Sequence, residues 1–149
     1  MTATKSADTI ETETAPAAAS NLVRLPLGLL GFEPIKNYAL LANPAEKPFA
    51  WLKVADNKSL AFVVIDPFVI MPDYKPEIPQ PDVEFLGLKA AADALLLCIV
   101  TIHNRNHATM NLKGPVVINR HSHVGKQVII ANAADYLVEY LLPVAAAVA

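Results

Sequence analysis

A chain of 149 residues with a net charge of −2 is long enough for one domain, since chains near this size bury roughly 68–70% of their unfolded surface. Hydrophobic residues make up 54% of it and charged residues 17%, which excludes a chain disordered throughout. The longest apolar run, residues 94–100, is too short for a membrane helix, and the first residues show no signal-peptide pattern. The single cysteine excludes an intrachain disulfide.

Residues 1–20 are rich in Thr, Ala and Glu and show no apolar period, so we predict a disordered tail there. Residues 144–149 are small and apolar, and we predict a frayed end. Between them, residues 21–143 contain no internal repeat and no linker, which indicates one domain.

Short apolar and alternating runs separated by turn residues predict about eight strands and an antiparallel barrel or sandwich, mainly β with one or two short helices. Residues 33–36 are expected to add one helical turn, and residues 136–142 fit a helix or a strand. The most apolar run, residues 94–103, is expected at the centre of the sheet. The predicted strands are residues 21–25, 38–42, 49–54, 60–65, 94–103, 108–113, 115–119 and 124–130.

Five prolines punctuate residues 66–81, and because proline has no N–H donor this stretch cannot be a central strand. We expect a stiff, extended loop, followed by a short helix that Asp82 caps. Phe68, Met71 and Tyr74 are spaced by three in this loop. They are either anchors for a partner, because a stiff loop loses little entropy on binding, or a lid over one end of the barrel.

The loop region is acidic, with six acidic and two basic residues between positions 66 and 93. Between positions 103 and 127 there are four basic residues and no acidic one. This distribution predicts either a molecule with one acidic and one basic side or two ordinary solvated loops. The basic stretch has no interleaved aromatics, so it is weak evidence for nucleic-acid binding.

Catalytic and metal-binding motifs are poor. The chain has no phosphate-binding glycine loop, and Cys98 lies in an apolar run that favours a buried, inert thiol. His121 and His123 form an H-x-H pair, which is a weak zinc signal because structural sites usually need four ligands. A small metal-binding or enzymatic barrel is therefore the runner-up to a protein-binding regulator, and a nucleic-acid-binding barrel is the third possibility. We expect no enzyme activity, metal or cofactor.

Three segments, in order, resemble signatures of FliW, a family of bacterial flagellar assembly factors. The first is Leu-Gly-Leu-Leu-Gly-Phe-Glu at residues 27–33. The second is residues 60–68 followed by Pro-Asp-Tyr at residues 72–74. The third is Asn-Leu at residues 111–112 with residues 115–119, then Gly-Lys-Gln at residues 125–127. The similarity runs from about residue 22 to residue 130. After that the chain departs from the short basic, aromatic tail of the family, because its last residues are longer, acidic and without arginine.

The resemblance implies a barrel-like cytoplasmic protein, expected to be a monomer, that binds newly made flagellin and the carbon storage regulator CsrA, a repressor of flagellin translation. Exchange between these partners would couple flagellin synthesis to export. No direct contact with nucleic acid or membrane is implied. The expected partner-binding residues are Phe68, Met71, Asp73, Tyr74, Glu77 and Asn119.

Overall fold

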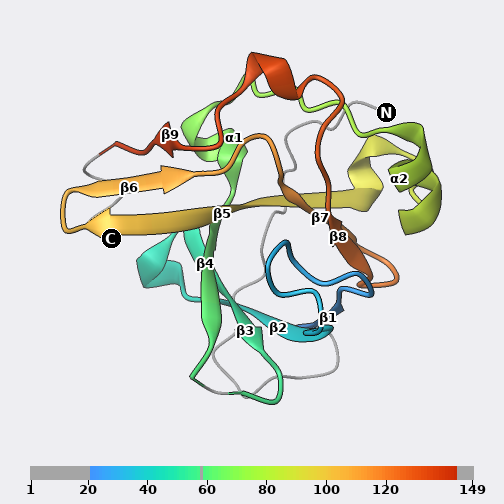
Figure 1. Ribbon diagram of the computed structural model, residues 1–149, viewed down its shortest axis with the longest axis horizontal. Coiled ribbons are helices and arrows are strands. Elements are labelled where there is room, and N and C mark those ends of the chain that lie inside the picture. The colour runs from blue at the N-terminus through green and yellow to red at the C-terminus, as the bar shows by residue number, and fades with distance from the viewer. Residues whose placement is uncertain (1–20, 58, 144–149) are drawn as a thin grey trace.

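The computed structural model describes residues 21–57 and 59–143, and within them nine strands form an antiparallel sheet (Figure 1). Along the main path the strand order is β1-β2-β3-β4-β5-β6-β9, and β7 pairs with both β5 and β8. The strands are β1 Leu22–Arg24, β2 Asn37–Ala42, β3 Phe49–Val54, β4 Ala61–Ile65, β5 Ala94–Asn104, β6 His107–Met110, β7 Val116–Asn119, β8 Gly125–Gln127 and β9 Tyr140–Leu141. The helices are α1 Pro67–Ile70 and α2 Gln80–Leu86, with 3-10 turns at Pro44–Glu46, Ala91–Asp93 and Ala133–Asp135.

Strand β5 is the centre of the sheet, as its apolar composition predicts. Its first half pairs with β7, its second half pairs with β6, and Cys98 and Ile99 pair with β4. Because successive side chains point to opposite faces, β5 contributes to two cores. Leu95 and Leu97 pack inside the curved sheet, whereas Leu96 and Cys98 pack under the helices and the proline-rich loop.

The sheet curls into a barrel-like shape without closing. A bridge pairs Arg24 at the end of β1 with Val124 just before β8, and the Arg24 N–H donates to the carbonyl oxygen of His123 at 3.0 Å. No continuous ladder of residues joins these two strands in the described chain. The predicted fold class, a small antiparallel barrel-like domain with one or two short helices, is confirmed.

The proline-rich segment differs from the expected extended loop. The Asp66 carboxylate accepts a hydrogen bond from the Phe68 N–H at 2.9 Å and caps α1, which begins at Pro67, a position where the missing N–H costs nothing. Helix α2 begins at Gln80 with Pro79 before it, so the prediction that Asp82 caps the helix is wrong; Asp82 lies inside the first turn.

Two further local predictions have clear outcomes. Residues 33–36 form no helix, and residues 136–142 contain strand β9. The two predicted tails, residues 1–20 and 144–149, lie outside the described residues. No helix in the described part of the chain is long and apolar enough to cross a membrane.

Candidate partner-binding site

Phe68 and Tyr74 belong to the core, with exposed fractions of 2% and 1%. Their rings lie 5.7 Å apart, and Tyr74 meets Tyr136 edge to face at 4.8 Å. The Tyr74 hydroxyl donates to the carbonyl oxygen of Leu112 at 2.6 Å, and burial raises the pKa of Tyr74. The lid arrangement is therefore the one observed, and neither ring can touch a partner in this conformation.

The backbone of the same loop is held against residues 131–136. The Lys75 N–H donates to the Tyr136 hydroxyl at 3.0 Å, and the Glu77 N–H donates to the side-chain oxygen of Asn132 at 2.9 Å. The amide of Asn132 returns a hydrogen bond to the carbonyl oxygen of Lys75 at 2.9 Å, and the Ala131 N–H donates to that of Glu77 at 2.7 Å. We call residues 71–79 the strapped loop.

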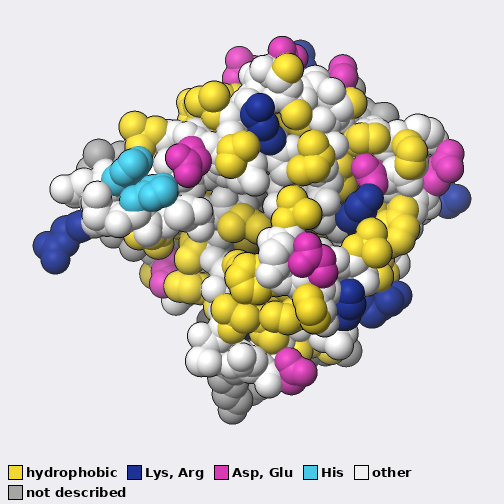
Figure 2. Space-filling model, in the orientation of Figure 1, with side chains coloured by type: hydrophobic (Ala, Val, Ile, Leu, Met, Phe, Trp, Pro, Cys, Tyr) yellow, Lys and Arg dark blue, Asp and Glu magenta, His cyan; other side chains and the backbone are white. Residues whose placement is uncertain are grey.

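Charged side chains of the strapped loop point outward from this fixed backbone. Asp73 and Glu77 are exposed, and Met71 is half-buried against the core. Acidic side chains gather at the top of the molecule, where this loop and the turn Ala133–Asp135 lie (Figure 2). The loop can therefore offer carboxylates to a partner at a low cost in conformational entropy.

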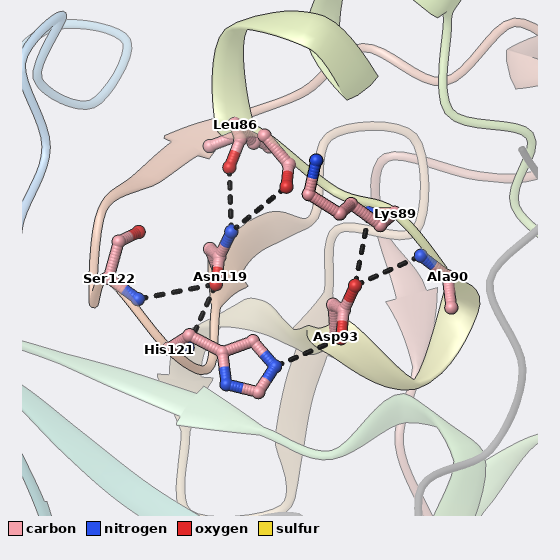
Figure 3. Close-up of polar contacts among 8 residues, drawn as sticks. Leu86, Lys89, Ala90, Asp93, Asn119, His121 and Ser122 are labelled. Carbon is pink, nitrogen blue, oxygen red and sulfur yellow. Dashed lines mark hydrogen bonds and ion pairs between the residues drawn. The ribbon is translucent and has the colours of Figure 1, made fainter.

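Asn119 uses its side chain inside the molecule. Its amide donates to the carbonyl oxygens of Leu86 at 2.8 Å and Gly87 at 3.4 Å (Figure 3). Its side-chain oxygen accepts from the N–H groups of His121 at 2.8 Å and Ser122 at 3.3 Å. Asn119 is buried and satisfies backbone groups at the end of α2 and in the β7–β8 hairpin, so it presents no group to a partner.

The hairpin that follows Asn119 carries a histidine paired with a distant carboxylate. Nε2 of His121 lies 2.9 Å from Oδ1 of Asp93, whose other oxygen accepts from the N–H groups of Lys89 and Ala90 (Figure 3). The hydrogen bond to His121 and these backbone bonds hold the pKa of Asp93 below its ordinary value. The pairing joins the hairpin tip to the segment after α2.

The histidines do not gather into a metal-binding cluster in the described part of the chain. No group of three or more His, Cys, Asp or Glu side chains within residues 21–57 and 59–143 is placed to hold a metal ion. Two other histidines, His103 and His107, stack with ring centroids 4.5 Å apart at the β5–β6 hairpin. Burial raises the pKa of Cys98, so its thiol is a poor source of thiolate.

The acidic and basic stretches of the sequence meet in space. Nζ of Lys126 on β8 forms an ion pair with Oδ1 of Asp82 on α2 and lies 5.7 Å from the ring centroid of Phe85. His121 and Asp93 form a second contact between the two stretches. The two stretches are therefore in contact where α2 packs beside β8.

An exposed apolar surface was not predicted from the sequence. Leu27 and Leu30 are exposed by 50% and 63%, and Phe32 and Ile129 are exposed as well. Three of these residues come from the glycine-containing loop between β1 and β2, over which hydrophobic side chains gather (Figure 2). We call Leu27, Leu30, Phe32 and Ile129 the loop surface. The glycines at positions 28 and 31 indicate a turn, but no local pattern separates the exposed Leu27 and Leu30 from the buried Leu29.

Comparison with known proteins identifies the family of this chain. Residues 4–142 match the family described as FliW protein. The chain belongs to the FliW family. A FliW flagellar assembly factor of Leptospira interrogans serovar Lai is 35% identical over 144 residues, covering 92% of this chain and 96% of the relative. The FliW of Leptospira biflexa is 40% identical over 113 residues, covering 74% of this chain and 74% of the relative. The FliW of Thermotoga neapolitana is 36% identical over 117 residues, covering 77% of this chain and 78% of the relative.

The FliW fold is also shared in three dimensions. A crystal structure of the flagellar assembly factor FliW superposes with a TM-score of 0.76 at 31% identity, covering 85% of this chain and 89% of the other. The family predicted from the three sequence segments is thereby confirmed. The match begins at residue 4, inside the segment predicted as a tail.

Proposed function

We propose that this chain is a non-enzymatic flagellar assembly factor of the cytoplasm that binds flagellin and antagonises the translational regulator CsrA. The observation that carries the proposal is the family match over residues 4–142, together with relatives named as flagellar assembly factors. By binding either flagellin or CsrA in turn, this one protein would couple flagellin synthesis to flagellin export.

The strapped loop supports the regulator half of the proposal. A protein that represses translation by gripping RNA is basic where it holds the phosphates. Asp73 and Glu77 are exposed on a backbone that four hydrogen bonds hold in place. Such a surface attracts a basic protein and repels RNA from it. In this proposal the loop carboxylates contact the regulator, Met71 lies at the edge of the contact, and buried Phe68 and Tyr74 shape the loop.

A calorimetric titration with purified monomeric flagellin tests the central claim. We expect binding at tens of micromolar or tighter, which is roughly −6 kcal/mol or more favourable, with a negative heat-capacity change from burial of apolar surface. In a second step, flagellin added to the preformed complex with CsrA is expected to release CsrA. Absence of heat and of co-elution with both proteins would show that the proposal is wrong.

A further inference from the structure

We propose that the loop surface, made of Leu27, Leu30, Phe32 and Ile129, is the docking surface for an amphipathic helix that carries acidic residues beside its apolar stripe. The inference rests on the proposed function in one respect: it takes flagellin as the protein that supplies this helix. The surface is separate from the strapped loop, so it assigns the two partners to different parts of the molecule.

Leu27, Leu30 and Phe32 come from one short loop, and Ile129 lies close to that loop through Gln127. The Leu30 N–H donates to the side-chain oxygen of Gln127 at 2.9 Å, which fixes the loop against β8. A Cβ on Gly114 would lie 3.4 Å from both the side-chain nitrogen of Gln127 and Cδ1 of Ile129, so these two side chains are neighbours over Gly114. Leu30 and Ile129 are therefore both close to Gln127.

The loop is preformed rather than pliable. Gly28 and Gly31 have φ values of +69° and +88°, and hydrogen bonds from Gly28 N–H to Leu25 and from Phe32 N–H to Leu29 close two successive turns. Phe32 is further fixed by an edge-to-face contact with Phe62 at 5.0 Å. Exposed apolar side chains on a rigid support are what a hydrophobic docking surface needs, because little entropy is lost when they are covered.

The charges beside the surface select the kind of helix. Arg24 and Lys36 are exposed, and they lie together because Arg24 pairs with Asn37 and the Leu25 N–H donates to the carbonyl oxygen of Lys36. An exposed acidic residue, Glu33, also lies near this pair. Its carboxylate accepts from the N–H of Gly31 at 3.1 Å, and backbone hydrogen bonds together with the charge of Lys36 hold the pKa of Glu33 below its ordinary value. In Figure 2, basic side chains lie along the right side of the apolar cluster, and acidic side chains lie above and below it. A helix with a stripe of apolar residues three and four apart and acidic residues on one flank is complementary to this surface.

Replacing both leucines, Leu27→Ser with Leu30→Ser, tests the surface directly. We expect flagellin affinity to fall at least tenfold while CsrA affinity stays within twofold of the parent. The matched control is Ile102→Ser with Leu141→Ser, which removes two equally exposed apolar side chains elsewhere and should leave both affinities unchanged. A second variant, Arg24→Gln with Lys36→Gln, should weaken flagellin binding severalfold at low salt and reduce its salt dependence.

The outcomes separate the inference from the proposed function. If the parent binds flagellin and the leucine variant binds equally well, the loop surface is not the docking site, although the proposed function stands. If the parent binds no flagellin, the proposed function and its named source of the helix both fail. If the parent self-associates in light scattering and the leucine variant does not, the occupant is a second copy and the helix assignment is overturned. Thermal melts of every variant establish that each is folded.

Discussion

The Tyr74 hydroxyl donates to the Leu112 carbonyl oxygen at 2.6 Å in the core. From the sequence alone, this tyrosine could be either a partner-binding anchor or a core residue. A tyrosine on a proline-stiffened loop has the apolar body and polar tip of an interface anchor. Here the tip is satisfied inside the domain, and the ring packs between Phe68 and Tyr136. The residue therefore contributes to stability and to the position of the strapped loop.

We expect Tyr74→Phe to lower the free energy of unfolding by about 1–2 kcal/mol, because the buried carbonyl of Leu112 loses its partner. Urea denaturation measures the change. Tyr136→Phe is the matched control: it removes a hydroxyl that accepts from the exposed Lys75 N–H, so its effect should be smaller. A Tyr74→Phe protein of unchanged stability but weakened CsrA binding would contradict this assignment and restore Tyr74 as an anchor.

At the scale of elements, the loop between β1 and β2 depends on its two glycines in different ways. Both adopt a positive φ, which L side chains rarely adopt. A Cβ on Gly28 would approach the backbone of Glu33 to 2.5 Å, whereas a Cβ on Gly31 would have no atom within 4 Å. A side chain at position 28 is therefore disfavoured both by a steric clash and by the positive φ, whereas one at position 31 is disfavoured by the positive φ alone.

We therefore expect Gly28→Ala to destabilise the domain by roughly 2–5 kcal/mol, combining left-handed strain with a backbone clash. Gly31→Ala should cost about 1–2 kcal/mol from conformation only. Chemical denaturation of the two variants side by side gives the comparison. Equal losses at the two positions would show that the close approach of Gly28 to Glu33 does not constrain the loop.

Across the whole molecule, the proposal assigns the regulator to the strapped loop and flagellin to the loop surface. Placing the partners on separate surfaces requires that exchange be transmitted through the domain or enforced by the size of the partners. Charge on the strapped loop is then expected to govern how fast the regulator arrives rather than how long it stays, because exposed rim carboxylates act mainly on association.

We expect Asp73→Asn with Glu77→Gln to slow CsrA association severalfold at low salt and to flatten its salt dependence, with little change in dissociation. Stopped-flow or biosensor kinetics at two salt concentrations measure this. Asp56→Asn with Glu46→Gln applies the same change in net charge in the two connections that flank β3 and should leave the rates unchanged. If both double variants slow association equally, net charge and not the strapped loop steers the regulator.

Strands with a regular hydrophobic pattern were predicted correctly from the sequence. The alternation at residues 49–54 predicts strand β3 with its observed bounds, Phe49–Val54, because one buried face imposes a period of two. The continuous apolar run beginning at residue 94 predicts β5, which is covered on both faces over residues 94–100. Helix α1 escaped prediction because four residues make one turn, which is too short to show a helical period.

The sequence by itself determined the β-rich class, the central strand and, through three ordered segments, the FliW family. Only the tertiary structure decided which side chains face solvent on the irregular segments, because a loop has no period from which burial can be read. It buried Tyr74 and Asn119, brought Lys126 to Asp82 across 44 positions of the chain, and left Leu30 exposed. These outcomes depend on contacts between segments distant in sequence, and local patterns carry no record of such contacts.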